Sequence, residues 1–198
     1  MYVFLPFPNI ETPRLHLRRL RREDASDMFE MRSDLRMHEH TDTSPDSTPE
    51  ESLVYIDKMN RGVDEGRWVI WAIEHKGTSA VIGTISIWNF DSGRNSGELG
   101  YGLIPSCQGQ GLMKESLLAV TDYGFTHLHL QTIEAYTEEQ NHSSSRVLEA
   151  CGFARAKTVR EEGYVQKRVF DMAVYTKEKD VAPLPKGTVL LVYSLSLK

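Results

Sequence analysis

The stretch QGQGLM, residues 108–113, has the composition of an anion-binding turn. It follows a strand-like run, SGELGYGLIP, and leads into a long helical run, LMKESLLAVTDYGFTHL. Glycine is costly inside regular structure, and Gly109 and Gly111 would let a phosphate approach the backbone closely. Unpaired N–H groups and the dipole at the start of the next helix attract an anion. The turn is therefore a candidate phosphate site, and the plain alternative is a connecting turn without a ligand.

Three phosphate-binding motifs compete for this turn. A Walker-type loop ends in Gly-Lys-Ser or Gly-Lys-Thr, and GLMK at residues 111–114 does not supply that ending. A dinucleotide fingerprint requires glycine where Lys114 stands, and it requires a parallel strand–helix–strand unit where this sequence predicts hairpins. A Gln-x-x-Gly-x-Ala turn, whose successive N–H groups face a pyrophosphate, fits except that Met113 replaces the alanine. The third motif is therefore the best match.

A second polar cluster follows further along the chain. Asn141 stands at the end of a predicted strand, and Ser144 stands in the first turn of a predicted helix. Asparagine is a good helix N-cap, so capping explains either residue by itself. In combination with the glycine turn, the two residues favour a ligand site over a purely structural turn.

The hydrophobic pattern places these residues at the ends of strands and helices. In chain order it predicts a strand, two helices, three strands, a helix, a strand, a helix and a final hairpin. The segments are 14–20, 23–34, 47–62, 67–76, 80–90, 96–105, 111–128, 130–139, 141–153 and 153–177. Successive hairpins give a mostly antiparallel sheet. The crossover helix 111–128 joins two strands that should lie parallel and adjacent.

Length and composition are those of a globular protein. The chain has 198 residues with 40% hydrophobic and 26% charged residues, which allows one large domain. We assign residues 1–180 to that domain and 181–198 to a C-terminal extension with a possible extra strand, because Pro183 and Pro185 interrupt the pattern.

Charge and cysteine content exclude several classes of partner. A net charge of −5 argues against nucleic acid, since phosphate binding needs a basic face. Cys107 and Cys151 form no metal-ligand spacing and no disulfide framework, so we expect no metal and a cytoplasmic protein. No apolar run approaches a membrane span, and MYVFLPFPNI lacks the basic flank of a signal peptide.

Taken together, these segments resemble the GNAT superfamily of acyl-CoA-dependent N-acetyltransferases, and within it the RimJ/RimL-like group. The stretches that carry the resemblance are ETPRLHLRRL, IGTISI, GELGYGLIPSCQGQGLMKESL and NHSSSRVLEACGF, spanning roughly residues 11–177. The resemblance implies an α+β, three-layer fold. Its mixed, mostly antiparallel sheet would splay between the fourth and fifth predicted strands, with helices on both faces.

The resemblance also implies the role of each site residue. Acetyl-CoA would be the co-substrate, its pyrophosphate held by the 108–113 turn and its pantetheine arm by the strand Gly100 to Ile104. Asn141 and Ser144 would flank the arm and the sulfur. The donor-binding residues expected in this way are Leu103, Ile104, Gln108, Gly109, Gln110, Gly111, Leu112, Met113, Asn141 and Ser144.

Acetyl transfer to an amine needs a base and a donor for the leaving thiolate. Amines are largely protonated at neutral pH, so a general base is required, and Glu98 is our candidate, acting directly or through water. Many members of the superfamily carry a tyrosine seven residues after the asparagine, but Leu148 stands there. Ser144 is then the better candidate for the acid. We expect Tyr136 and Tyr164 to pack, and we expect His38 and His40 to be solvated loop residues.

The acceptor should approach over residues 36–60 and the turn at 161–164. Acidic residues on that side suit a cationic amine; they are Glu39, Asp42, Asp46 and Glu98. The resemblance favours a protein N-terminal α-amine, with a polyamine or an antibiotic as the alternative. A non-catalytic acyl-CoA-binding domain and a ligand-free interaction module stay open, as does a homodimer formed through the apolar tail.

Overall fold

The computed structural model describes residues 2–93 and 95–180. Its strands are β1 (Ile10–Glu11), β2 (Leu15–Arg18), β3 (Val69–His75), β4 (Val81–Asp91), β5 (Ser96–Leu103), β6 (Thr132–Glu138), β7 (Ala154–Glu162) and β8 (Val169–Glu178). Its α-helices are α1 (Ala25–Ser33), α2 (Pro49–Asp64), α3 (Leu112–Thr126) and α4 (His142–Ala150). Short 3-10 helices are η1 (Arg22–Asp24), η2 (Leu35–His38) and η3 (Pro105–Cys107). The expected extension at 181–198 lies outside the described residues.

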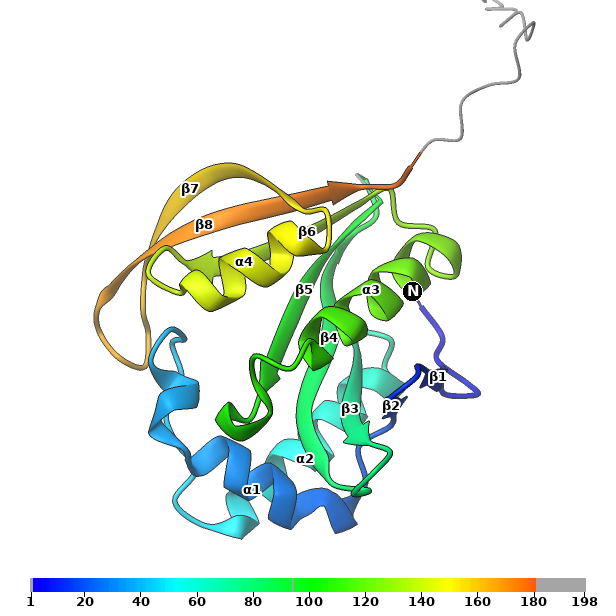
Figure 1. The fold of residues 1–198 in the computed structure, drawn as a ribbon, viewed down its shortest axis with the longest axis vertical. Coiled ribbons are helices and arrows are strands. Elements are labelled where there is room, and N and C mark those ends of the chain that lie inside the picture. Colours follow the sequence, from blue (N-terminus) through cyan, green and yellow to red (C-terminus); the bar gives the residue numbers. More distant parts are fainter. Residues whose placement is uncertain (1, 94, 181–198) are drawn as a thin grey trace, which may run out of the picture.

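Within the described residues, eight strands form one sheet in the order β1-β2-β3-β4-β5-β6-β8-β7. The pair β5–β6 is parallel and the other pairs are antiparallel. Figure 1 shows α3 and α4 in front of the sheet and α2 behind it, with α1 packed against α2. The mixed sheet, the crossover helix and the helices on both faces confirm the predicted fold class.

The sequence pattern locates the long elements correctly and misses the short ones. β3 is continuously apolar from Val69 to Ile73 and is buried along that length, as expected for a central strand. β1 is only two residues long, which is too short to show a period of its own, and it was not predicted. The 3-10 turns also have no periodic signature.

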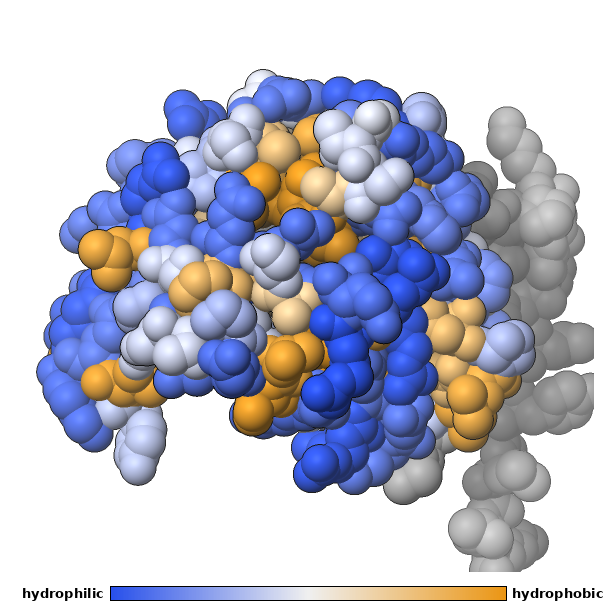
Figure 2. All heavy atoms as spheres, turned by 90° about the horizontal axis from the view of Figure 1, so that it is seen from below, coloured by the Kyte–Doolittle hydropathy of each residue, from blue (hydrophilic) through white to orange (hydrophobic). Residues whose placement is uncertain are grey.

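The core lies on both sides of the central strands. Trp71 of β3 is fully buried, and its indole N–H donates to the Pro8 carbonyl at 2.6 Å. Its ring meets Tyr123 of α3 edge to face, with centroids 5.4 Å apart. The face shown in Figure 2 is mostly hydrophilic, with apolar residues in separate patches, as is ordinary for a protein surface.

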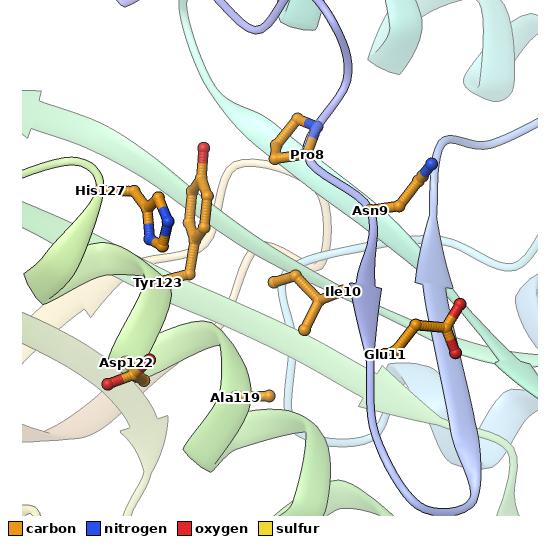
Figure 3. Close-up of a pocket in the computed structure, with 8 residues that line it drawn as sticks. All are labelled: Pro8, Asn9, Ile10, Glu11, Ala119, Asp122, Tyr123 and His127. Atoms are coloured by element: carbon orange, nitrogen blue, oxygen red, sulfur yellow. The ribbon is translucent and has the colours of Figure 1, made fainter.

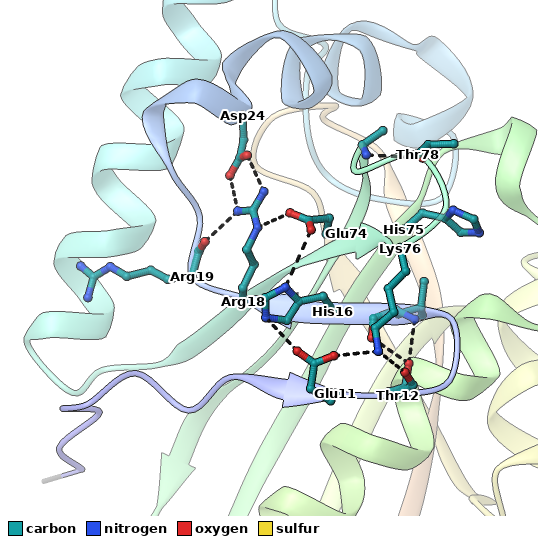
Figure 4. A network of polar contacts seen from close by, with 12 residues as sticks. Glu11, Thr12, His16, Arg18, Arg19, Asp24, Glu74, His75, Lys76 and Thr78 are labelled. Carbon is teal, nitrogen blue, oxygen red and sulfur yellow. Dashed lines mark hydrogen bonds and ion pairs between the residues drawn. The ribbon is translucent and has the colours of Figure 1, made fainter.

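A buried charge cluster joins β2 to the segment before α1. Arg18 is 4% exposed, and its guanidinium donates to both Asp24 carboxylate oxygens at 2.7 and 2.8 Å. Its Nε donates to Glu74 on β3, so the cation is held from two sides (Figure 4). A second Asp24 contact, from the Arg21 backbone N–H at 2.7 Å, fixes the chain entering α1. Removing one partner from such a cluster leaves a buried charge incompletely paired.

We therefore expect Asp24→Ala to lower the free energy of unfolding by about 3 kcal/mol, the cost of an uncompensated buried charge. Urea denaturation measures this value. The matched control is Asp64→Ala, which removes the exposed pair with Arg19 and should cost less than about 1 kcal/mol. Equal losses in the two variants would contradict the special role of the buried cluster.

Candidate active site

The pairing between β5 and β6 ends halfway along the two strands. The last paired residues are Leu99 and Ala135. β5 stays paired with β4 as far as Leu103, and β6 stays paired with β8 as far as Glu138. Each strand therefore follows its own outer neighbour, and the two diverge, as Figure 1 shows. The predicted splay is confirmed, and it leaves backbone groups on the inner strand edges without a partner strand.

A cavity of about 540 Å³ occupies this opening. Its lining includes the predicted base Glu98, the predicted acid Ser144 and the predicted site residue Asn141, together with Tyr101 and Tyr136. The side chains of a strand alternate between the two faces of a sheet, so Glu98 and Tyr101 of β5 project to opposite faces. Because both line one cavity, the cavity passes through the sheet between β5 and β6.

Glu98 faces the side of the sheet that carries η2. It is part of the same strand face as Gly102, whose Cα hydrogen points toward Met37 of η2. Burial raises the pKa of the Glu98 carboxyl above its ordinary value. A hydrogen bond from Asn89 Nδ2 at 3.2 Å opposes the rise. The negative charges of Glu161 and Glu134 add to it.

Asn141 and Ser144 lie together at the start of α4. Asn141 is the N-cap, and its Oδ1 accepts from the Ser144 backbone N–H at 3.1 Å. This leaves the Ser144 side chain directed away from the cap, with its Oγ 2.7 Å from the Tyr101 hydroxyl. The capping role and a position at the ligand cavity are therefore compatible. Leu148 is fully buried, so it packs the helix against the core.

Sequence reasoning missed Tyr101. A tyrosine in a half-buried strand is ordinary, and its partner Ser144 is 43 residues away. The available signal was the strand alternation, which places Tyr101 on the face opposite Glu98 and toward the helices that follow β5 and β6.

Tyr136 also lines the cavity, where its hydroxyl donates to Glu134 Oε2 at 3.3 Å.

The glycine turn is built to leave its backbone open. Gly109 and Gly111 have φ values of +74° and +76°, in the left-handed region that favours glycine. No atom lies within 4 Å of the position that a Cβ at Gly109 would take. α3 begins at Leu112, so the N–H groups of its first turn have no partner inside the helix. Leu112 is buried and Met113 packs partly against the core, so both anchor the turn.

Side-chain hydrogen bonds to backbone carbonyls support the turn. Gln108 Nε2 donates to the Leu103 carbonyl at 2.9 Å, and Gln110 Nε2 donates to the Ser106 carbonyl at 3.0 Å. Arg14, just before β2, donates from Nη1 to the Gln110 carbonyl at 2.9 Å. Both glutamines therefore use their side chains for the fold, and the Gln108 backbone N–H also donates to the Pro105 carbonyl at 3.2 Å.

A network on Glu115 holds Arg14 in place. The carboxylate accepts from Arg14 Nε at 2.7 Å and from the Thr12 hydroxyl at 2.6 Å.

The predicted donor-site residues Leu103 and Ile104 make some of their backbone hydrogen bonds within the protein, since the Ile104 N–H donates to the Ile82 carbonyl at 2.8 Å. The Leu103 carbonyl keeps a second lone pair beyond its bond to Gln108.

The side on which we expect the acceptor is closed by two segments far apart in the sequence. The Asp42 carboxylate accepts backbone N–H bonds from Tyr164, Val165 and Gln166, and these bonds lower its pKa. Gln166 Nε2 returns bonds to the carbonyls of three loop residues, His38, Thr41 and Thr43. The loop after η2 and the β7–β8 turn thus form one wall, which we call the acceptor wall (residues 38–43 and 163–168).

The charges of this wall differ from the sequence-based expectation. Asp46 is buried and bonded to Arg32 at 2.7 and 2.8 Å, so its charge is compensated. Asp42 is committed to backbone N–H groups, and Glu39 does not line the cavity. Glu161 and Glu162, from the end of β7, are among its lining residues, and the Glu161 charge acts on Glu98. Two of the four predicted acidic residues, Asp42 and Glu98, therefore line the cavity, and two that were not predicted, Glu161 and Glu162, join them.

The two loop histidines are hydrogen-bonded within the fold, His38 buried and His40 half-buried, which corrects the expectation of solvated residues. His38 is buried, with Nδ1 2.7 Å from the Thr43 hydroxyl and Nε2 2.7 Å from the Arg32 carbonyl. His40 Nδ1 lies 2.7 Å from Glu138 Oε2. Glu138 also accepts from Arg168 at 2.6 Å, so it joins β6 to the wall. Polar loop residues can be buried when their side chains are hydrogen-bonded in this way, and amino-acid composition does not reveal that burial.

A second hollow, of about 460 Å³, lies between the N-terminal segment and α3. Figure 3 shows Pro8, Asn9 and Ile10 on one side and Tyr123 with His127 on the other. The Tyr123 and His127 rings stack with centroids 5.0 Å apart. This hollow contains none of the predicted site residues.

Comparisons with known proteins agree with the geometry. The model of the acetyltransferase (GNAT) domain family matches residues 14–154. An uncharacterized N-acetyltransferase of Bacillus subtilis, YoaA, is 29% identical over 170 residues, covering 86% of this chain and 96% of that protein. None of the described helices is long and apolar enough to cross a membrane.

Two solved structures share the fold. RimL, a ribosomal-protein α-N-acetyltransferase in complex with coenzyme A, superposes with a TM-score of 0.75 at 19% identity, covering 86% of this chain and 98% of RimL. A spermidine N-acetyltransferase from Vibrio cholerae, in complex with CoA and spermine, gives 0.72 at 20% identity, covering 84% and 96%. The chain belongs to the GNAT acetyltransferase family. It is an N-acetyltransferase, and acetyl-CoA is the acyl donor in this family.

The residues present fit that donor. Open space over Gly109, free N–H groups at the start of α3 and an unpaired strand edge beside Ser144 are what a pyrophosphate and an extended thioester arm require. These features come from the backbone, so they depend on the two glycines and on the end of strand pairing.

We expect Gly109→Ala to weaken CoA binding by roughly tenfold or more, because its methyl group would fill the space over the turn. The left-handed φ also costs about 1 kcal/mol of stability. Isothermal titration with CoA measures the affinity. Gly152→Ala is the matched control: Gly152 has φ +84° at the end of α4, so the strain is similar and the affinity should not change. Equal affinities in all three proteins would contradict a role of the turn in CoA binding.

Proposed function

We propose that this protein transfers an acetyl group from acetyl-CoA to a primary amine by direct attack, with Glu98 as the base and Ser144 as the hydrogen-bond donor to the leaving sulfur. One observation carries the proposal: Glu98 and Ser144 line a single cavity that passes through the sheet. An amine entering on the Glu98 side and a thioester lying along β5 on the other side would meet in the opening.

The donor would lie along the unpaired inner edge of β5. The turn at 108–113 would bind the pyrophosphate through its backbone N–H groups, and the strand Gly100 to Ile104 would bind the pantetheine arm. Asn141 would keep Ser144 in position through its bond to the Ser144 N–H. Acetyl-CoA itself supplies the activated acyl group, and the protein's residues orient it.

Glu98 suits the role of base because its raised pKa moves it toward the pH at which it works. A base is most effective when its pKa lies near the operating pH. The amine must lose its proton to become a nucleophile, and the carboxylate of Glu98 would take it directly or through one water. Ser144 would then stabilise the thiolate by a hydrogen bond, which needs no ionisation of the serine.

For the acceptor we favour a protein N-terminal α-amine, whose pKa near 8 makes it easier to deprotonate than a lysine amine. The fold shared with RimL supports this choice. A polyamine is the second candidate. It is favoured by a specific observation: two further acidic residues, Glu161 and Glu162, and two aromatic residues, Trp88 and Tyr136, line the cavity with Glu98, and carboxylates and aromatic rings both attract a cation.

An amine screen tests the proposal. Thiol release from acetyl-CoA is followed with peptides of varied N-termini, with the same peptides blocked at the N-terminus, and with polyamines. We expect turnover with free peptides and none with blocked ones. Turnover with polyamines alone would favour the second candidate. CoA binding without turnover on any amine would show a non-catalytic acyl-CoA-binding domain instead.

We expect Glu98→Gln to lower kcat by about 100-fold, in the range for loss of a general base. In the wild type, kcat should fall as the pH drops through the raised pKa of Glu98, above 4.5, because the protonated carboxyl cannot accept a proton. This acid limb should disappear in Glu98→Gln. Rate profiles against pH measure both effects.

Two further variants sharpen the assignment. Asn89→Ala removes the hydrogen bond that lowers the pKa of Glu98, so the acid limb should move to higher pH. Glu178→Gln changes an exposed carboxyl at the end of β8, outside the cavity, and should keep the wild-type profile. An unaltered profile in Glu98→Gln would remove Glu98 from the mechanism.

A further inference from the structure

Tyr101 lines the cavity, and the reaction above provides no role for it. It lies on β5 next to the end of the β5–β6 pairing, and its side chain crosses to α4. The phenol oxygen is 2.7 Å from Ser144 Oγ. A buried tyrosine hydroxyl usually finds a hydrogen-bond partner, and Ser144 is the partner recorded for Tyr101 among the described residues.

The hydrogens of this pair can be assigned from the chemistry of the two hydroxyls. Each hydroxyl has one hydrogen and can also accept. Both residues line the cavity, so exposure alone does not set the donor, but the phenol is the stronger acid and the weaker acceptor of the two, which favours Tyr101 as the donor. If Tyr101 donates to Ser144, both oxygens are satisfied and the Ser144 hydrogen is free to turn into the cavity. This arrangement is the favoured one.

We propose that Tyr101 is a positioning residue for acetyl transfer: its phenol donates to Ser144 Oγ and so directs the Ser144 hydrogen toward the leaving sulfur of CoA. The inference rests on the proposed function and adds a residue to it. Tyr101 acts through Ser144 and exchanges no proton with the substrate.

The proton balance of the reaction agrees with this role. The ammonium first passes one proton through Glu98 to solvent; the neutral nitrogen then forms the new C–N bond and gives a second proton to Glu98, while the C–S bond breaks and its electron pair stays on sulfur. The products are the amide, protonated Glu98 and the CoA thiolate, which is held by the Ser144 hydrogen bond. Solvent later removes the proton from Glu98 and supplies one to the sulfur, so Tyr101 begins and ends as a neutral phenol.

The environment of Tyr101 keeps it in this donating form. Burial raises the pKa of the phenol well above its ordinary value, and the hydrogen bond to Ser144 opposes this rise only in part. Tyr101 therefore stays protonated at every pH at which an amine acceptor would be used. Its donation to Ser144 does not change with pH.

A second tyrosine shows what a purely structural contact with α4 looks like. Tyr175 of β8 is buried, and its hydroxyl donates to Glu149 Oε1 of α4 at 3.2 Å. Tyr175 does not line the cavity. It provides the matched control, since Tyr175→Phe removes a buried hydroxyl bonded to the same helix without affecting the sulfur position.

The test titrates the thiol of CoA bound to the protein, using the ultraviolet absorbance of the thiolate. The Ser144 hydrogen bond should lower the apparent pKa of the bound thiol, so Tyr101→Phe should raise that value by about one pH unit, a tenfold change in the thiolate ratio. Ser144→Ala should raise it similarly, and adding Tyr101→Phe to Ser144→Ala should change nothing more. Ser144→Thr and Tyr175→Phe should titrate as the wild type does.

Steady-state rates give the second readout. Tyr101→Phe should lower kcat by about tenfold while the KM for acetyl-CoA stays within about twofold, because the hydrogen bond acts on the leaving sulfur. A thiol titration of Tyr101→Phe that coincides with the wild type, or an equal shift in Tyr175→Phe, would overturn the inference. If the variants shift the pKa of the bound thiol as expected but the wild type acetylates no amine, the proposed function is contradicted and the positioning role of Tyr101 stands.

Discussion

The arrangement of the site depends on one constraint: two parallel strands that stay paired for only part of their length. β5 is tied to β4 and β6 is tied to β8 beyond the point where Leu99 and Ala135 end the pairing between them. Because every buried backbone group needs a partner, the exposed inner edges of the two strands are costly unless a ligand or solvent uses them. The opening is therefore both the weak point of the sheet and the place where a substrate can replace a missing strand.

The chemistry is divided by the sheet itself. Strand alternation sends Glu98 to one face of β5 and Tyr101 to the other, and the helix that starts beside β6 brings Ser144 to Tyr101. A few residues of a single strand thus separate the group that would accept a proton from the pair that would stabilise a thiolate. The brace formed by Arg14, Glu115 and the Gln110 carbonyl fixes the turn at the far end of the same strand.

Much of this could be predicted from the sequence because the signals are local. Long apolar strands, the crossover helix and the two glycines of the turn each show within a few residues, and Asn141 with Ser144 marks a helix start. The rest depends on contacts between distant segments. The Tyr101–Ser144 pair, the burial of His38 and the commitment of Asp42 to the β7–β8 turn arise from tertiary packing, which local patterns do not encode. The presence of Glu161 and Glu162 in the cavity lining has the same origin.

The acceptor wall has a consequence for how such a scaffold diversifies. The wall consists of two short connections, joined to each other through Asp42 and Gln166, while the donor side is formed by strands and a helix start. Changing one connection alone would leave either the Asp42 carboxylate or the backbone N–H groups of the β7–β8 turn without their hydrogen-bond partners. If the acceptor enters over this wall, as proposed, exchanging both connections together would alter the acceptor selectivity and leave the strands and helix start of the donor side unchanged. The donor side of the fold can thus stay unchanged while the sequence of the acceptor wall varies.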